Sequence, residues 1–280
     1  MNINSLFGVI VLYETTLAES KTFKSIQKGL RKQNIPFDIL VYDNSSEPKY
    51  SSEYFEVENT RINYIHDSSN SGISKAYNVG AKMARKLNKS WLLLMDQDTE
   101  FPPTIFDAYL SGIEHHPSIK LIAPILKLTN GTIFSPCHYI FKRGFTKKIV
   151  KPGINQFKKS SPVNSGMLVN LEAFEKAGGY NESIKLDFSD FQFIEKFRVE
   201  NNRFLLLDNV AIQDFSNDIT NITSLVKRYE IYCNDAKNCI PIRFYDPVIY
   251  MINALLRAMK LYVRTRDLMF LKIWLKMFVL

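Results

Sequence analysis

The residues best suited to chemistry are two aspartates one position apart, Asp96 and Asp98, which follow the apolar run 91–95. Paired carboxylates after a buried strand supply the hard oxygen ligands that Mg²⁺ and Mn²⁺ prefer, and substrate phosphates complete the shell of such an ion. A cation held there would bridge a diphosphate and neutralise the charge on a leaving nucleoside diphosphate. Aspartate is also common in solvated turns, so a turn is the alternative for this pair taken alone.

Three earlier apolar runs also end in polar, turn-forming residues. These ends are Tyr13-Glu14 after 7–12, Asp43-Asn44-Ser45 after 37–42, and Asn70-Ser71-Gly72 after 62–65. Helical patterns at 17–33 and 71–87 alternate with the runs, which predicts a mostly parallel sheet covered on both faces. Ligands of such sheets bind beyond the carboxyl ends of the strands. Four polar strand ends therefore predict one ligand site at that edge.

The second half of the chain is less regular. Strand patterns lie at 121–125, 163–170 and 204–207, helical patterns lie at 172–177 and 190–200, and the segment 128–162 is rich in turn formers with some β character. The composition shifts near Asn217, and helical patterns rich in Tyr, Leu, Ile, Lys and Arg follow. We therefore expect a domain over residues 1–218 and a C-terminal helical region over 219–280.

Single residues at the strand ends have two interpretations each. The carboxylate of Asp43 could accept the imide N–H of uracil or thymine, but an Asx-turn explains the same residue. Gly72 could let the backbone approach a phosphate closely. Asn70 and Asn78 have a similar ambiguity, and Gly80 could equally allow tight packing of a helix on the sheet.

Taken in chain order, these motifs resemble the family 2 inverting glycosyltransferases, which have the GT-A fold. The resemblance covers about residues 7 to 218 and rests on the stretches Val9 to Tyr13, Val41 to Ser45, Asn70 to Gly80, Leu92 to Asp98, Asn164 to Val169, and Gly178 to Glu182 through Asp187 and Asp190. It implies a Rossmann-like, mostly parallel sheet flanked by helices. With Gln97 in the middle of Asp96-Gln97-Asp98, the triplet resembles that of the rhamnosyltransferase branch of the family. Members of this branch build bacterial cell-surface polysaccharides and usually use dTDP-L-rhamnose.

The resemblance also implies roles for individual residues. Asp98 would bind the Mg²⁺ or Mn²⁺ ion, and Asp190 would act as general base on the acceptor hydroxyl, with Asp187 as the second choice. The donor pocket would consist of Tyr13, Glu14, Asp43, Asn44, Asn70, Gly72, Lys75, Asn78, Asp96 and Gln97, with Asp43 at the nucleobase and Asp96 near the ribose or the metal. A carboxylate that faces the acceptor can take the proton that the attacking hydroxyl loses. Without the resemblance, we would interpret Asp190 as a negative charge that stabilises the N-terminus of a helix.

The expected reaction is transfer of a sugar, L-rhamnose first, to a glycan or a lipid-linked oligosaccharide acceptor. The alternatives are a transferase that uses UDP-galactofuranose or a UDP-hexose, and a non-catalytic subunit that binds a sugar nucleotide. Nucleic acid is not an expected partner, because the chain has no recognised nucleic-acid-binding module.

Two positions depart from the family pattern. Gln192 stands where relatives often have an acidic residue after the base, so contacts to the acceptor should differ. Many relatives have a histidine that ligates the metal after the late strand, whereas this chain has Gln213-Asp214-Phe215-Ser216. Asp214 can ligate Mg²⁺ or Mn²⁺ instead, or it can be a structural turn residue.

The C-terminal region combines basic and apolar residues. The net charge of the chain is +8, and helical patterns at 247–263 and 268–280 place Lys and Arg opposite Leu, Trp and Phe. Amphipathic helices of this type suit the surface of an anionic membrane, and packing on the catalytic domain or an oligomer interface is the alternative.

Cysteine usage and the apolar runs indicate the compartment. The three cysteines are odd in number and have no CxxC spacing, which fits free thiols in a reducing compartment. The N-terminus has no charged region before its apolar run, and no stretch is long and apolar enough to span a bilayer. We therefore expect a cytoplasmic protein, peripheral at the inner face of the cell membrane.

Overall fold

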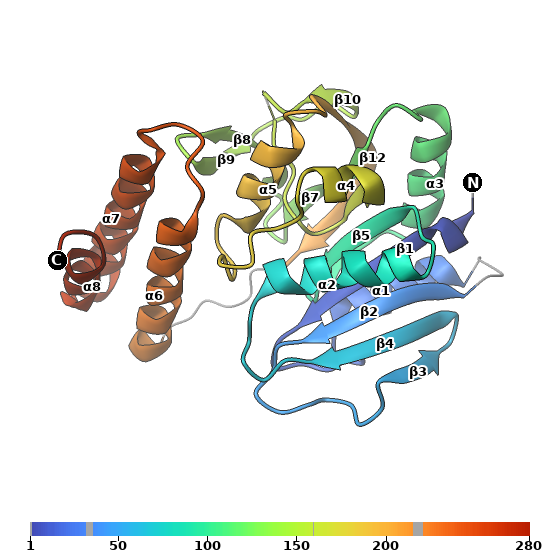
Figure 1. The fold of residues 1–280 in the computed structure, drawn as a ribbon, viewed down its shortest axis with the longest axis horizontal. Helices are drawn as coiled ribbons and strands as arrows, with labels where there is room; N and C mark the ends of the chain where they lie inside the picture. The colour runs from blue at the N-terminus through green and yellow to red at the C-terminus, as the bar shows by residue number, and fades with distance from the viewer. Residues whose placement is uncertain (1, 32–35, 159, 215–220) are drawn as a thin grey trace.

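The computed structural model describes residues 2–31, 36–158, 160–214 and 221–280. Its centre is a sheet whose parallel part consists of β1 (Leu6–Leu12), β2 (Phe37–Asp43), β4 (Thr60–His66) and β5 (Trp91–Asp96), in the spatial order β5-β1-β2-β4. Every residue of β1 and β2 is buried, as expected for strands covered on both faces. The four strands predicted in the first half of the sequence are confirmed (Figure 1).

Helices cover both faces of this sheet. Helices α1 (Lys21–Leu30) and α3 (Ile105–His115) pack on the face that includes Leu6 and Ile10, and α2 (Ile73–Lys86) packs on the face that includes Phe7 and Val9. A Cβ atom at Gly80 would overlap the side chain of Val9, so the glycine allows α2 to lie close to β1. Helix α3 was not predicted from the sequence.

The second half extends the sheet with both strand directions. Strands β7 (Leu121–Leu128) and β12 (Arg203–Gln213) are parallel to each other, and β11 (Met167–Asn170) runs antiparallel between β7 and β5. The expected strand at 163–170 is therefore shorter, because Gly166 has a φ of +81° and turns the chain into β11. Helices α4 (Leu171–Lys176) and α5 (Ser189–Phe197) are confirmed and cover the α2 face.

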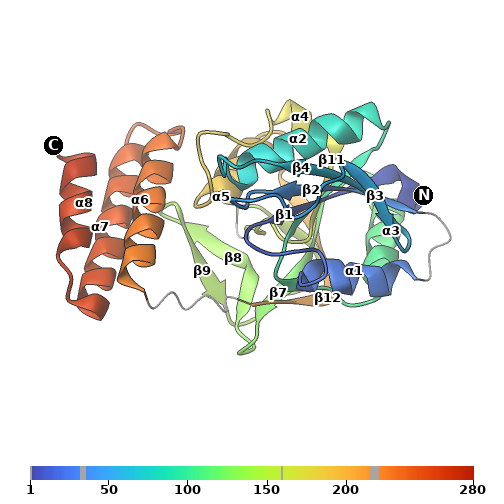
Figure 2. The ribbon, with the colours of Figure 1, turned by 90° about the horizontal axis from the view of Figure 1, so that it is seen from below.

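Short strands complete the edges. Strand β3 (Tyr54–Val57) pairs with β4, β10 (Gly153–Gln156) pairs with β12, and β6 (Thr99–Glu100) also pairs with β12. The hairpin of β8 (Ile133–Ile140) and β9 (Arg143–Lys147) continues from β7 and lies between the sheet and the C-terminal helices (Figure 2).

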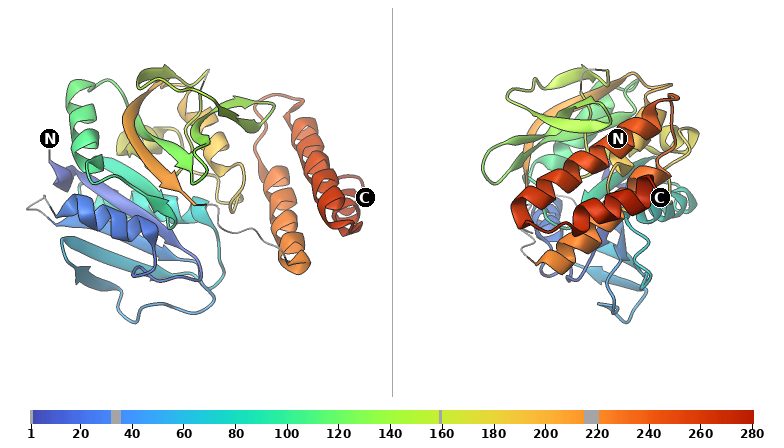
Figure 3. Two further views of the ribbon diagram at one scale, coloured as in Figure 1. Left: turned by 180° about the vertical axis from the view of Figure 1, so that it is seen from behind. Right: turned by 90° about the vertical axis from the view of Figure 1, so that its left-hand side faces the viewer.

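The C-terminal region is a layer of three helices, α6 (Ile222–Asn238), α7 (Asp246–Thr265) and α8 (Met269–Phe278), which lie side by side (Figure 3). They share an apolar core with Ile184 and Phe188 from the preceding part of the chain. None of the described helices is long and apolar enough to cross a membrane. The expected boundary at 218/219 falls in or beside residues 215–220, which lie outside the described residues, and it stays a prediction.

Candidate active site

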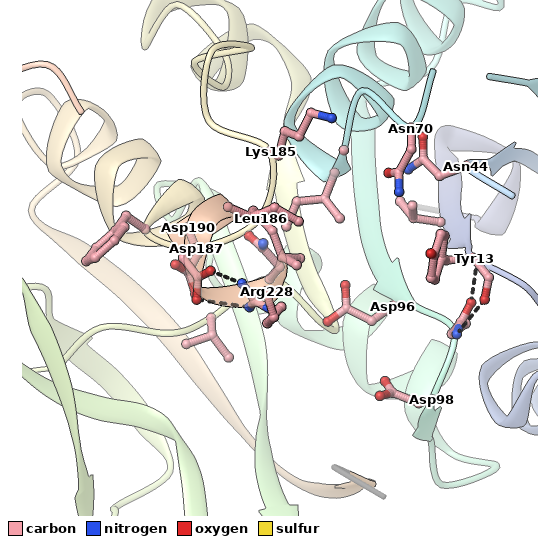
Figure 4. A pocket seen from close by; sticks show the side chains of 18 of the residues that line it. Tyr13, Asn44, Asn70, Asp96, Asp98, Lys185, Leu186, Asp187, Asp190 and Arg228 are labelled. Atoms are coloured by element: carbon pink, nitrogen blue, oxygen red, sulfur yellow. Dashed lines mark hydrogen bonds and ion pairs between the residues drawn. The ribbon is translucent and has the colours of Figure 1, made fainter. Parts of the chain in front are cut away.

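A cavity of about 1060 Å³ lies at the carboxyl ends of β1, β2 and β5. The four polar strand ends all contribute to its wall, through Tyr13, Asn44, Asn70, Gly72, Asp96, Gln97 and Asp98. The opposite wall comes from the segment 185–191 and from α6 (Figure 4). The expected convergence of these strand ends is therefore observed.

Asp96 and Asp98 lie at the floor of the cavity, where β5 ends. Asp96 Oδ1 accepts a hydrogen bond from the Tyr77 hydroxyl at 3.0 Å, and Oδ2 accepts one from Gln213 Nε2 at 3.4 Å. The same Nε2 lies 3.5 Å from Asp98 Oδ1. The amide of Gln213 thus bridges the two carboxylates.

Both carboxylates hold their protons more tightly than free aspartate. Burial raises the pKa of Asp96. Burial, followed by repulsion from Asp96 and a smaller effect of Asp214, raises the pKa of Asp98 to about 7. A bound cation reverses such shifts because it favours the ionised form of each carboxylate.

Gln213 supplies the clearest sign that these residues fit a cation. Its side chain is only 4% exposed and lines the cavity, and its Oε1 has no hydrogen-bond partner among the described residues. The Nε2 end of the amide faces the two carboxylates, so the amide would have to turn over for Oε1 to join them. After that rotation, the amide oxygen and the two carboxylates would form a hard donor set of the kind that Mg²⁺ and Mn²⁺ prefer. Within the described ranges no three Asp, Glu, His or Cys residues form a metal-binding group, so protein carboxylates alone would not fill the shell.

Asp214 does not line the cavity. Its carboxylate forms an ion pair of 2.5 Å with Lys21 Nζ, and its backbone N–H points to the carbonyl of Asp98 at 3.4 Å. The predicted ligand role of Asp214 would require this ion pair to open.

Gln97 ties two strand ends together. Its Oε1 accepts a hydrogen bond from the Tyr13 backbone N–H at 2.7 Å, and its Nε2 donates to the Tyr13 carbonyl at 3.3 Å (Figure 4). The middle residue of the acidic triplet therefore fixes the loop after β1, whose Tyr13 ring is exposed at the cavity wall. Asn44 lines the same wall, and its buried Oδ1 has no partner within the described part of the chain.

Four of the predicted donor residues do not line the cavity. Asp43 is buried, and its carboxylate accepts hydrogen bonds from the Tyr64 hydroxyl at 2.6 Å and from the Ser45 N–H at 2.9 Å, the contact of an Asx-turn. The side chains of the other three each contact neighbouring loops: Glu14 contacts Ser46 and Lys49, Lys75 contacts Asp67 and Ser71, and Asn78 contacts Tyr180 and Glu182. These residues shape the loops around the cavity.

Gly72 lies where two segments meet. It has a φ of +92°, and a Cβ atom there would overlap the carbonyl oxygen of Lys185. That carbonyl accepts a hydrogen bond of 2.9 Å from the N–H of Ile73, the first residue of α2. Close approach of this backbone therefore explains the glycine, independently of any phosphate.

Asp190 faces the cavity from the first turn of α5. It follows Phe188, a helix N-cap with the left-handed φ of 66°, and its Oδ1 accepts a hydrogen bond from the Phe191 N–H at 2.8 Å. Burial, together with the negative charges of Asp96 and Asp187, raises the pKa of Asp190 to about 7. Asp187 lies beside it but forms ion pairs with Arg228 and, at 3.4 Å, Arg257.

Comparison with known proteins agrees with this geometry. The family model described as glycosyl transferase family 2 matches residues 15–150. Residues 15–150 of the chain are thus similar to the family 2 glycosyltransferases. The chain is 27% identical over 194 residues to the dTDP-rhamnosyl transferase RfbF of Shigella flexneri, an alignment that covers 69% of this chain and 62% of that protein. The chain thus matches less than two thirds of that relative.

Solved structures show the same fold. TarS of S. aureus in complex with UDP-GlcNAc superposes with a TM-score of 0.55 at 17% identity, covering 96% of this chain and 78% of that one. The mannosyltransferase PcManGT from Pyrobaculum calidifontis, in complex with GDP-Man and Mn²⁺, superposes with a TM-score of 0.53 at 10% identity, covering 96% and 84%. The expected GT-A fold is confirmed.

Some of the residues that line the cavity were missed in the sequence. Gln213 was seen only as a departure from the family pattern, and its buried amide was not predicted. Lys185, Lys227 and Arg228 line the wall opposite the strand ends. No local pattern could have indicated the helix α6 residues, because their partners in the site lie tens of positions away in the chain.

Proposed function

We propose that the protein is an inverting glycosyltransferase that moves a sugar from a nucleotide-sugar donor to an acceptor hydroxyl. The observation that carries the proposal is that Asp96 and Asp98, at the end of β5, and Asp190, at the start of α5, face one cavity. Asp96 and Asp98 suit the diphosphate end of a donor, and Asp190 lies across the cavity, where an acceptor can enter. A base opposite the leaving group is what inversion requires.

L-rhamnose from dTDP-L-rhamnose is the proposed donor sugar. The support is the 27% identity to a dTDP-rhamnosyl transferase and the Gln97 of the acidic triplet. UDP-galactofuranose or a UDP-hexose is the alternative. Tyr13, Asn44, Asn70 and Gly72 would surround the donor, with Asp43 and the other non-lining residues acting through the loops that they hold.

A Mg²⁺ or Mn²⁺ ion would complete the donor site. Asp98 would ligate it, with Asp96 close by and with Gln213 Oε1 once the amide turns over, and donor phosphates would fill the remaining positions. When bound, the ion would neutralise charge on the leaving diphosphate. Asp214 remains the competing ligand that the sequence suggests, although it now pairs with Lys21.

Asp190 would take the proton of the acceptor hydroxyl. Its raised pKa of about 7 makes it a stronger base than ordinary aspartate while it is still substantially ionised near neutral pH. The N–H of Phe191 holds one carboxylate oxygen, which leaves the other for the acceptor. Asp187 is less suited to this role because two arginines already neutralise it.

The acceptor would be a glycan or a lipid-linked oligosaccharide in the synthesis of cell-surface polysaccharide, such as a capsule or a cell-wall polymer. We propose that the C-terminal helices bring the enzyme to an anionic membrane from the cytoplasmic side. A stripe of apolar residues on α7, each between 46% and 62% exposed, supports this: Val248, Ile252, Leu256, Met259 and Val263. Two exposed basic residues flank it, Lys260 and Arg264. An oligomer interface is the other use of the same stripe.

The test of the function is release of nucleoside diphosphate from a panel of dTDP- and UDP-sugars with Mn²⁺ or Mg²⁺. We expect dTDP-rhamnose to be turned over best, and Asp190→Asn to abolish turnover while the affinity for dTDP stays within about twofold. Asp208→Asn, an exposed carboxylate on β12, is the matched control and should keep full activity. Full activity of Asp190→Asn would remove it from the role of base, and binding of dTDP without turnover of any sugar would favour the non-catalytic alternative.

Membrane contact is tested separately with the full chain. Flotation with phosphatidylglycerol vesicles should decrease when Ile252, Leu256 and Met259 are all changed to serine. Equal flotation of the wild type and the triple variant would contradict membrane binding through α7. A change from dimer to monomer in the variant would favour the oligomer interface.

A further inference from the structure

The segment 185–187, directly before the proposed base, is held from the C-terminal helices. Asp235 on α6 is 1% exposed, and its carboxylate accepts hydrogen bonds from three consecutive backbone N–H groups: Lys185 at 2.8 Å, Leu186 at 3.0 Å and Asp187 at 2.8 Å. A buried carboxylate with three backbone donors fixes the path of a loop more firmly than apolar contacts alone, because displacement would leave buried polar groups unpaired.

Two arginines hold the side chain of the same segment. Arg228 on α6 donates through both terminal nitrogens to the two oxygens of Asp187, one of them at 3.0 Å (Figure 4). Arg257 on α7 approaches the same carboxylate at 3.4 Å. A bidentate arginine fixes direction as well as distance. The guanidinium of Arg257 also lies over the ring of Tyr232, 4.1 Å from its centroid.

The other side of the segment meets the donor wall. The carbonyl of Lys185 accepts the N–H of Ile73 and packs on Gly72, so the segment connects the start of α2 with α6. Phe188, the next residue along, has a left-handed backbone that costs free energy and persists only when the surroundings enforce it. Asp190 follows within the first turn of α5.

We propose that Asp235, Arg228 and Arg257 are positioning residues, which set the location of Asp190 from the C-terminal helices through the segment 185–187. The proposal rests on the proposed function only in the role given to Asp190. Its physical basis is that a misplacement of about 1 Å at a reacting group costs about 100-fold in rate, whereas the donor wall, built from β1, β2 and β5, stays in place.

The test uses the full chain with Arg228→Met and Arg228→Lys, and with Lys237→Met as the control that removes one exposed charge from the same helix. The first readout is hydrogen–deuterium exchange of peptides that cover residues 181–191. We expect Arg228→Met to exchange at least about fivefold faster in these peptides and no faster in peptides that cover 91–98, because only the acceptor wall loses a contact.

The second readout is release of dTDP from dTDP-rhamnose with Mn²⁺. Arg228→Met should lower kcat about tenfold or more and leave KM within about twofold, and Arg228→Lys should recover part of the loss. A merely structural role would instead lower the melting temperature and reduce the amount of active enzyme, without a local change in exchange.

The outcomes are separable from those of the proposed function. Unchanged exchange in 181–191, or an increase spread over the whole chain, would overturn the positioning role even if Asp190 is the base. Faster local exchange with unchanged kcat would also overturn the positioning role. A fully active Asp190→Asn variant would instead refute the role of Asp190 as general base, and the measured exchange would remain a property of the segment 185–187. Asp235→Asn should show the same local increase in exchange, with Glu230→Gln on the exposed face of α6 as its control.

Discussion

Replacement of Lys142 by methionine should strongly destabilise the protein. Lys142 is 7% exposed in the turn between β8 and β9, and its Nζ lies 2.7 Å from Glu195 Oε1 on α5 and 2.9 Å from Asp246 Oδ2 on α7. Both carboxylates are buried, at 4% and 1% exposure of the side chains. Methionine keeps the apolar stem of the lysine but leaves two buried carboxylates without the cation between them.

The expected loss follows from this arrangement. Removing one partner of a buried ion pair costs about 3–5 kcal/mol. The chain has 280 residues. An unfolding entropy of about 2.1 cal/mol/K per residue then gives about 1.7 °C for each kcal/mol. We therefore expect the melting temperature at pH 7.5 to fall by about 5–9 °C.

The loss should depend on pH in a known direction. Burial alone raises the pKa of Asp246, but hydrogen bonds from Lys142 and from the backbone of Arg243 and Ile242 lower it below its usual value. A lowered pKa contributes stability that is present above the unfolded pKa and is lost as pH falls through the folded pKa. Without Lys142 the carboxyl can hold a proton, so the difference between variant and wild type should shrink from pH 7.5 to pH 4.5.

The assay is thermal unfolding followed by circular dichroism, with Lys148→Met as the control at an exposed lysine of the same region. A fall below about 2 °C for Lys142→Met, or a fall equal to that of the control, would refute the reasoning that the buried ion pairs hold α7 against α5. A loss that grows toward acid pH would refute the electrostatic explanation and point to packing.

Three further predictions concern the cavity. The raised pKa of Asp190 means that, between pH 4 and 7, the folded protein keeps a proton which the unfolded chain releases, so the wild type loses stability as pH rises. Asp190→Asn removes this loss, and its gain in melting temperature over wild type should therefore be larger at pH 8 than at pH 5. Gln213→Ala should weaken Mn²⁺ binding about tenfold by titration calorimetry, and Asp214→Asn should weaken it less; the reverse order would assign the ligand to Asp214. Gly72→Ala should lower the free energy of unfolding by more than about 2 kcal/mol, measured by denaturant unfolding. Gly131 has a similar positive φ but open space around it, so Gly131→Ala should cost about 1 kcal/mol, and equal losses for the two variants would contradict the backbone clash at Gly72.

The donor half of the molecule could be predicted because its signals are local. Strands such as β1 and β2 are continuous apolar runs, and each ends in a polar turn at the edge of the sheet where the cavity lies. Helix α3 is a regular element, but it was not predicted from the sequence.

The acceptor half depends on contacts that no local pattern reports. Arg228 and Asp187 are 41 positions apart, and Asp235 and Lys185 are 50 positions apart. Asp43 combines both cases: its Asx-turn contact with the Ser45 N–H is local and was one of the two interpretations of the sequence, whereas its contact with the Tyr64 hydroxyl spans 21 positions. The strand end and the turn were predictable there, and the long-range partner was not.

The cavity wall made by α6 has a consequence for how such an enzyme can be recombined. Because Lys227 and Arg228 line the cavity wall opposite the strand ends while α7 and α8 pack behind them, the three helices form one exchangeable piece that carries both its own outer surface and a part of the cavity wall. A chimera that takes this piece from a relative would therefore change the acceptor side and the docking surface together. Donor choice would stay with the strands that the recipient keeps.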